Sequence, residues 1–338
     1  MSISPSLLLS RRAFLRAGAL AGAALLCPLP ALAHPLPLTR TRLLMGTLVG
    51  ISVAPGGDPS SERLEAAIDA AFARMASLES ILSRHDSASP LAELNRAGRL
   101  ADAPPALCAV IDRAKRCHSL TSGAFDATVA PVLDVLRRAQ NPKGRMELDP
   151  KALREAVCLV GDGALTRHGS TLALGRTGMS VTLDGIAKGY IVDAASRCLH
   201  EAGIHNHLIN AGGDIVAQGH KAPGSPWLVG IEAPDTRERP LLTLPLAAAI
   251  ATSGRAHMYF DASREHHHII NPLTGASPAR VHSVSVTAPS ALEADALATA
   301  LSVMAPHDAL HLARSLPGVE CAVILVDGTL LTSPGLRA

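Results

Sequence analysis

Short apolar runs alternate irregularly with longer segments of helical periodicity along most of this 338-residue chain. This order constrains the fold more than any other feature of the sequence. A regular alternation of one strand with one helix would predict a parallel sheet, whereas strands in adjacent runs favour other arrangements. We therefore expect an α+β fold, as a single mixed domain with antiparallel or mixed sheets and interspersed helices.

Three segments have the spacing of amphipathic helices. Residues 61–82 place apolar side chains at helical intervals, and residues 105–120 do so until the turn-forming pair at 122–123. A third helix is expected over 186–199. These helices interrupt the strand-rich part of the sequence.

The strand-rich runs combine apolar and β-branched residues between turn signals. Residues 42–53 are expected to form one strand, ended by the turn at 55–57. A further apolar strand is expected to carry histidines 266–268. The shorter runs expected to be strands are 180–183, 207–209, 227–231, 242–249, 281–288 and 321–326.

The composition excludes several classes of partner and covalent framework. A formal net charge of +2, with no long basic run, gives no electrostatic footprint for nucleic acid or an anionic membrane. The six cysteines include no C-x-x-C pair, and five would remain after removal of Cys27. We therefore expect no nucleic-acid partner and no disulfide framework.

The N-terminus has the organisation of an export signal. Paired arginines at 11–12 precede an apolar run at 17–26 and the small-residue triplet 31–33. The arginine pair resembles a twin-arginine signal, whereas an anchor helix would need roughly 20 apolar residues. We expect removal of residues 1–33, which leaves 34–338 as one domain in the periplasm. A lipid anchor at Cys27 is not favoured, because the two leucines before it lack the usual small residue.

One expected helix carries a possible metal site. Ser290 and Glu293 fit a capping box, so a helix should begin at Ser290. Asp295 and Thr299 are then four positions apart on one helix face. Their oxygens suit Mg²⁺, which completes its shell with water and substrate phosphate. From these two residues alone, a solvated polar stripe is the simpler interpretation.

Other segments supply possible catalytic and anion-binding groups. Histidines 266–268 invite a transition-metal interpretation, but successive strand residues point to opposite faces and cannot all bind one ion. A catalytic or ligand-contacting role for one of them is favoured. Segments 184–190 and 210–214 contain glycines that allow close approach of backbone to phosphate, although each alone is compatible with an ordinary turn. Residues 123–129 could equally be a capped turn.

Together and in this order, these segments resemble the ApbE family of FAD:protein FMN transferases. The matching segments are 45–47, 83–85 through 94–95, 123–129, 184–190, 212–214, 251–254, 268–275 and 294–299. The most specific of them are Lys188-Gly189-Tyr190, Thr252-Ser253-Gly254 and the Asp295/Thr299 pair. They span nearly all of residues 34–338.

The resemblance implies transfer of FMN from FAD to a threonine or serine hydroxyl of an acceptor flavoprotein, with release of AMP. FAD would be the substrate, held in a central cleft, and Mg²⁺ the cofactor. The acceptor would be a membrane or periplasmic protein with a D/S-G-x-T/S-like motif, through which peripheral membrane contact could occur. Two alternatives stay open: an FAD pyrophosphatase and a non-catalytic, exported FAD-binding protein.

The resemblance also assigns residues to roles. The residues expected to contact FAD are Met45, His85, Ala124, Phe125, Asp126, Thr182, Lys188 and Ile269. Asp295, Thr299 and the main-chain carbonyl of Gly185 would hold Mg²⁺. His268 would be the base that accepts the proton of the acceptor hydroxyl.

Four positions depart from the usual family pattern. Thr182 stands where Asp is common, and Asp184 is a candidate to replace that acid. His85 stands where an aromatic residue usually covers the flavin ring. Arg255 and Asn271 replace frequent acids. These departures are compatible with a twin-arginine-exported, NosX-like subgroup that serves membrane proteins of electron transfer, such as those of nitrous-oxide respiration.

Overall fold

An eight-stranded antiparallel sheet organises the fold in this computed structural model, which describes residues 37–55, 60–140, 146–234 and 240–336. The strand order is β1-β2-β6-β7-β10-β11-β12-β13. These strands are β1 (Leu38–Leu44), β2 (Thr47–Val53), β6 (His207–Ala211), β7 (Asp214–Gln218), β10 (Ala249–Gly254), β11 (Val281–Ala288), β12 (Glu320–Leu325) and β13 (Leu330–Thr332). The predicted signal at 1–33, with Cys27, lies outside the described residues.

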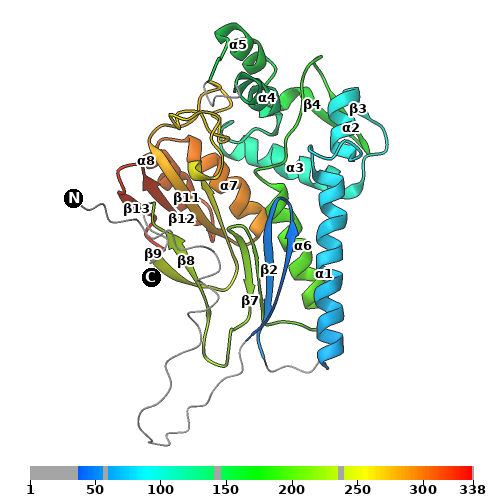
Figure 1. The fold of residues 1–338 in the computed structure, drawn as a ribbon, viewed down its shortest axis with the longest axis vertical. Helices are drawn as coiled ribbons and strands as arrows, with labels where there is room; N and C mark the ends of the chain where they lie inside the picture. Colours follow the sequence, from blue (N-terminus) through cyan, green and yellow to red (C-terminus); the bar gives the residue numbers. More distant parts are fainter. Residues whose placement is uncertain (1–36, 56–59, 141–145, 235–239, 337–338) are drawn as a thin grey trace, which may run out of the picture. The chain divides into compact units, whose positions relative to one another are not determined.

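Three helices pack over one face of this sheet (Figure 1). They are α1 (Ser61–Leu82), α6 (Ala187–Glu201) and α7 (Ala291–Val303). Alternate strand residues such as Val49 and Ile51 of β2, and Val284 and Val286 of β11, join the helices in the main hydrophobic core. This alternation is the pattern of a strand with one face buried against helices.

A two-stranded hairpin packs against side chains on the other face. Its strands are β8 (Trp227–Glu232) and β9 (Pro240–Leu246). Residues alternate between buried and exposed along β8, and Trp227 and Val229 share a second core with Ile215 and Ile250 of the large sheet. Odd-numbered residues of β10, such as Ala251, therefore face α7, whereas Ile250 faces the hairpin.

The segment between α1 and α6 in the sequence forms smaller elements, which gather at one end of the large sheet (Figure 1). Its helices are α2 (Pro90–Ala97), α3 (Pro105–Leu120), η1 (Ala127–Val129), α4 (Ala130–Ala139), α5 (Pro150–Cys158) and η2 (Asp162–Ala164). Its three-stranded sheet has the order β3 (Arg99–Leu100), β5 (Thr171–Leu174), β4 (Leu165–His168). Two further helices, η3 (Arg255–His257) and α8 (Pro306–Ser315), flank β11 and α7 in the sequence.

The helix predictions are confirmed. Helices α1 and α3 have the predicted bounds, and α6 begins at Ala187, one residue later than expected. Helix α7 begins after Ser290, whose hydroxyl accepts the Glu293 N–H over 3.2 Å. Among the described helices, none is both long and apolar enough to span a bilayer.

The prediction of a single strand over 42–53 is wrong, because the chain reverses at Met45 and Gly46. These residues have φ values of 52° and 70°, and Leu44 pairs with Thr47 across the turn. Two consecutive left-handed residues are typical of a two-residue hairpin turn. Apolar residues on both sides of the turn concealed it in the sequence.

Two further strand predictions are wrong. Residues 180–183 form no strand, since the Asn95 amide bonds both the N–H and the carbonyl of Val181 at 2.7 and 2.8 Å. The run at 242–249 divides between β9 and β10.

The histidine segment also differs from its prediction. Only an isolated bridge between Tyr259 and His267 forms there, and the Ser277 hydroxyl contacts the His267 N–H and carbonyl at 2.9 Å. A side chain thus takes the place of a neighbouring strand.

Candidate active site

Helices α6 and α7 meet at a contact that only glycine permits. A Cβ on Gly189 would lie 2.2 Å from the carbonyl oxygen of Ala291, closer than atoms can approach. The Gly189 N–H consequently reaches Asp295 Oδ2 and donates to it over 3.0 Å. This bond holds the carboxylate of α7 against the first turn of α6.

Thr299 lies one turn beyond Asp295 on the same face of α7. Its Oγ1 is 3.5 Å from the Gly185 carbonyl oxygen and 3.2 Å from Ser253 Oγ. A Cβ on Gly185 would lie 2.9 Å from Thr299 Oγ1, so glycine is needed here too. The three residues that the family resemblance assigns to the metal therefore lie at one junction between α7 and the loop before α6.

Two buried carboxylates share one ammonium group beside this junction. Lys188 forms an ion pair with Asp214, which is almost fully buried. Burial alone would lower the pKa of Lys188, but Asp214 and Asp295 outweigh this effect and raise it. Burial, and then the charge of Asp214, raise the pKa of Asp295 to about 8. A carboxylate at position 295 thus lacks full charge compensation.

These residues fit a divalent cation. Asp295, Thr299 and the Gly185 carbonyl offer a carboxylate, a hydroxyl and a main-chain oxygen, all of the hard type that Mg²⁺ prefers. Positive charge at this place would favour the ionised form of Asp295, which burial disfavours. Three protein ligands also leave coordination positions for water or phosphate, as is usual for Mg²⁺.

The loop before α6 is tied to the turn that follows α3. The Thr182 N–H donates to the Ala127 carbonyl over 2.8 Å. Asp126 caps η1, because its Oδ1 accepts the N–H and the hydroxyl of Thr128 at 2.8 and 2.6 Å. Phe125 is buried beside it. The interpretation of residues 123–129 as a capped turn is therefore confirmed.

His85 lies just beyond α1 and faces Asp184. Its Nε2 is 3.5 Å from Asp184 Oδ2, and both side chains are about half exposed. Desolvation works to raise the pKa of Asp184, but hydrogen bonds with His85 and Thr182 outweigh it and lower the pKa. The pKa of the Asp184 carboxyl is thus held low beside His85, two positions after Thr182.

Met45 and Ala124 are half-buried at separate turns. The Met45 N–H donates to Glu79 Oε1 over 2.9 Å, which fixes the β1–β2 turn to α1. Ala124 lies in the capped turn, two residues before Asp126. Neither residue is joined to the Lys188–Asp295 junction by the hydrogen bonds described above.

The three adjacent histidines contact different groups. Their contacts are Asp261 Oδ2 for His266 Nδ1 at 2.9 Å, the Pro278 carbonyl for His267 Nε2 at 3.1 Å, and the Met258 carbonyl for His268 Nδ1 at 3.2 Å. A carbonyl can only accept, so Nδ1 of His268 carries a proton. Ile269, the next residue, is buried.

The sequence comparisons agree with this arrangement of segments. A family model described as the ApbE family matches residues 45–323, a range that begins at Met45 and includes every residue assigned above. The chain belongs to the ApbE family. A Treponema pallidum (strain Nichols) protein named FAD:protein FMN transferase is 31% identical over 326 residues, which are 88% of this chain and 87% of that protein. A Vibrio cholerae relative of the same name is 35% identical over 212 residues, 61% of this chain and 63% of that one.

Solved structures of other ApbE proteins have the same α+β fold. The crystal structure of the Thermotoga maritima ApbE protein matches with a TM-score of 0.79 and 27% identity, over 88% of this chain and 97% of that chain. The flavin transferase ApbE from Vibrio cholerae matches with a TM-score of 0.73 and 28% identity, over 88% and 96%. The fold class predicted from the sequence is thereby confirmed.

Two polar residues of this ApbE-family junction were not assigned from the sequence. Asp214 pairs with Lys188, and Ser253 contacts Thr299. Both belong to segments that stand out in the sequence, Gly212-Gly213-Asp214 and Thr252-Ser253-Gly254. The sequence signal available for both was a polar residue beside glycine. That signal does not identify their partners, which are far away in the sequence.

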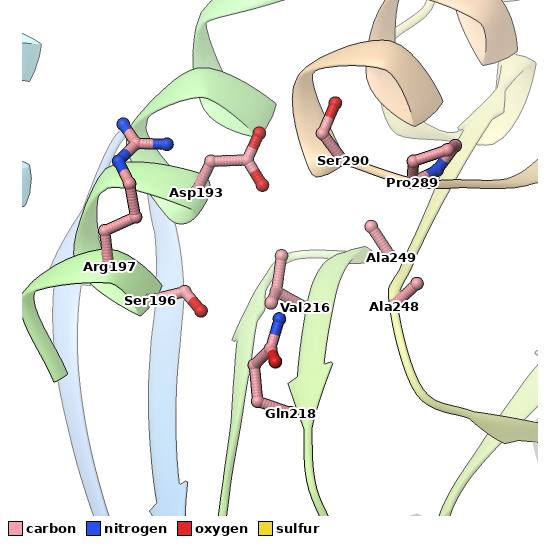
Figure 2. Close-up of a pocket in the computed structure, with 9 residues that line it drawn as sticks. All are labelled: Asp193, Ser196, Arg197, Val216, Gln218, Ala248, Ala249, Pro289 and Ser290. Atoms are coloured by element: carbon pink, nitrogen blue, oxygen red, sulfur yellow. The ribbon is translucent and has the colours of Figure 1, made fainter. Parts of the chain in front are cut away.

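A separate cavity of about 200 Å³ lies at the beginning of α7 (Figure 2). Its lining residues are Asp193, Ser196, Arg197, Val216, Gln218, Ala248, Ala249, Pro289 and Ser290. The Asp193 carboxylate accepts the N–H groups of Ala291 and Leu292 at 2.9 and 3.0 Å. None of the residues assigned to FAD, metal or catalysis lines this cavity. The acidic residue in its lining, Asp193, caps α7.

Proposed function

We propose that this chain transfers FMN from FAD to a threonine or serine hydroxyl of an acceptor flavoprotein, with Mg²⁺ as cofactor and AMP as the second product. The observation that carries the proposal is the junction of Lys188, Asp214, Asp295 and Thr299. It lies within the range matched by the ApbE family. The names of the Treponema and Vibrio relatives give the reaction class.

The junction would bind the pyrophosphate of FAD. Asp295, Thr299 and the Gly185 carbonyl would hold Mg²⁺, which neutralises phosphate charge and polarises the reacting phosphorus. Lys188 remains protonated, because neighbouring carboxylates raise its pKa, and supplies a second positive charge. Asp214 orients the Lys188 ammonium through their ion pair.

The other residues that the family resemblance assigns to FAD would position the rest of this substrate. Asp184 would serve where Thr182 replaces the usual acid, and His85 beside it would stack on a ring of the substrate. The other residues proposed to contact FAD are Met45, Ala124, Phe125, Asp126, Thr182 and Ile269.

His268 is proposed as the base. Its Nδ1–H donates to the Met258 carbonyl over 3.2 Å, so in the neutral ring the lone pair is on Nε2. Nε2 would accept the proton of the acceptor hydroxyl as its oxygen attacks phosphorus. This Nδ1 bond selects the tautomer in which Nε2 is the basic nitrogen.

The reaction balances without a further reactant. The acceptor oxygen forms a bond to the phosphorus of the FMN part of FAD, and the bond from that phosphorus to the bridging oxygen breaks. The electron pair leaves with that oxygen on AMP, whose charge Lys188 would stabilise. The products are a phosphoester-linked FMN-protein and AMP.

A direct test uses the chain from residue 34 onward, FAD, Mg²⁺ and an acceptor protein containing a D/S-G-x-T/S-like motif. Intact-mass spectrometry should show the FMN adduct on the acceptor protein, with AMP formed in equal amount. No adduct should form when the threonine or serine of the motif is replaced by valine. AMP and free FMN without adduct would contradict the transferase proposal and identify a pyrophosphatase. Tight FAD binding without AMP would identify a non-catalytic binding protein.

We also propose export by the twin-arginine route and action in the periplasm on a membrane or periplasmic flavoprotein of a NosX-like electron-transfer system. The support is the sequence of residues 1–33, with Arg11 and Arg12 before an apolar run. Cell fractionation should place the wild-type chain in the periplasm and the Arg11→Lys/Arg12→Lys variant in the cytoplasm. Equal periplasmic amounts of both would contradict this route.

A further inference from the structure

Thr299 has one hydroxyl proton and two possible acceptors for it. One is the Gly185 carbonyl oxygen at 3.5 Å, and the other is Ser253 Oγ at 3.2 Å. A hydroxyl donates a single hydrogen bond but offers two lone pairs. The direction of this proton therefore decides what Thr299 can present to the junction.

The two directions differ in their consequence for a bound cation. If Thr299 donates to Gly185, its proton lies between two oxygens that are both proposed ligands, and it occupies a lone pair of the carbonyl. If Thr299 donates to Ser253, lone pairs of Thr299 and of the Gly185 carbonyl can face the same cation. The shorter contact is the one to Ser253.

We infer that Ser253 is a positioning residue for divalent-cation binding: its oxygen accepts the Thr299 proton and directs a Thr299 lone pair to the cation. This inference rests on the proposed function, because it uses the same cation site. Ser253 acts through Thr299 and does not itself touch the cation. Outer hydrogen-bond partners of this kind commonly change metal affinity 10- to 100-fold.

The sheet determines which hydroxyl of β10 can fill this role. Ala251 faces the main core under α7, and residues two apart on a strand share a face, so Ser253 faces α7 as well. Thr252 points to the other face, where its Oγ1 is 2.8 Å from Ser285 Oγ. Adjacent hydroxyls of similar chemistry therefore lie on opposite sides of the sheet, which provides a matched control.

The test measures Mn²⁺ binding, from the electron paramagnetic resonance signal of the free ion, to the chain from residue 34 onward. Ser253→Ala should weaken Mn²⁺ binding about tenfold or more. Thr252→Val should bind like wild type, because its hydroxyl lies on the other face. Thermal unfolding without metal checks that each variant is folded.

An isosteric pair keeps the test decisive if Ser253→Ala does not fold. Ser253→Thr retains the hydroxyl and should bind within about twofold of wild type, whereas Ser253→Val has nearly the same shape and should show the loss. Equal Mn²⁺ affinities of these two variants would overturn the inference. An equal loss in Thr252→Val would also overturn it, since strand distortion would then explain the effect.

Asp295→Asn separates this inference from the function on which it rests. If wild type binds Mn²⁺, Asp295→Asn does not, and Ser253→Ala binds like wild type, only the role of Ser253 fails. If wild type itself binds no Mn²⁺, the cation site and the role of Ser253 both fail.

Discussion

At the scale of single residues, close backbone approach determines the geometry of the proposed cation site. The Gly189 N–H reaches Asp295 because no side chain separates α6 from α7 at this point. Gly185 likewise allows its backbone to approach Thr299 closely. The two glycines thus position the oxygens of α7 although neither contributes a side chain.

Replacing Gly189 by alanine should therefore destabilise the fold. The added Cβ would overlap the Ala291 carbonyl, so the helices must move apart, and we expect a loss of about 3 kcal/mol in the free energy of unfolding. Urea denaturation measures this change. Gly163→Ala is the control, because a Cβ there meets nothing within 4 Å and its φ lies outside the left-handed region. Wild-type stability of Gly189→Ala would contradict the close contact.

At the scale of elements, α7 carries both a doubly capped first turn and two of the proposed cation ligands. Its first turn is capped by Ser290 and by Asp193 of α6, and its following turns present Asp295 and Thr299. Almost every residue of this helix between 291 and 302 is buried. Its position therefore depends on contacts with both α6 and the sheet.

Asp193→Ala should lower the free energy of unfolding by about 2 kcal/mol. The reason is that two backbone N–H groups at the beginning of α7, those of Ala291 and Leu292, lose their acceptor. Thermal denaturation checks the effect, with Asp308→Ala as control because Asp308 is an exposed acid in the first turn of α8. If both variants lost the same stability, a specific cap by Asp193 would be excluded.

Local elements were predictable where local chemistry determines them. The helices at 61–82 and 105–120 follow from apolar periodicity, and the beginning of α7 follows from Ser290 and Glu293. The prediction failed where a distant side chain intervenes, as Asn95 does at Val181. Such a contact leaves no local signal in the sequence.

At the scale of the whole molecule, the candidate site depends on pairings across the sequence. Gly185 and Thr299 are 114 residues apart, and Lys188 and Asp214 are 26 apart. Sequence motifs indicated most of these residues, but only the family resemblance indicated that they belong to one site. The partners themselves require the packing of α6, α7 and β10, which no periodicity specifies.

The stability of the whole fold should depend on pH through His207. This side chain is fully buried, donates from Nδ1 to the Ile204 carbonyl over 2.9 Å and contacts the Ser196 hydroxyl through Nε2 at 2.8 Å. Burial lowers its pKa from 6.5 to about 4. Between these values the unfolded chain binds a proton at His207 that the folded chain does not, so the contribution of His207 to stability falls as pH is lowered, by up to about 3 kcal/mol.

Urea unfolding between pH 4.5 and 7 tests this dependence. His207→Gln should be less stable than wild type at neutral pH, and the difference in the free energy of unfolding between the two should shrink as pH is lowered. His307→Gln should keep the wild-type slope, because the His307 side chain is 92% exposed. A wild-type slope in His207→Gln would show that another group causes the dependence.

The most direct test of the central claim is FMN transfer to an acceptor protein at increasing Mg²⁺, measured by intact mass for wild type and Asp295→Asn. Asp295 belongs to the proposed cation site, is buried, accepts the Gly189 N–H and is subject to the charge of Asp214. We predict that transfer by wild type saturates with Mg²⁺ and stops with a chelator, and that Asp295→Asn loses at least 100-fold in rate at all Mg²⁺ concentrations, about 3 kcal/mol. Undiminished transfer by Asp295→Asn in the presence of the chelator would contradict the account.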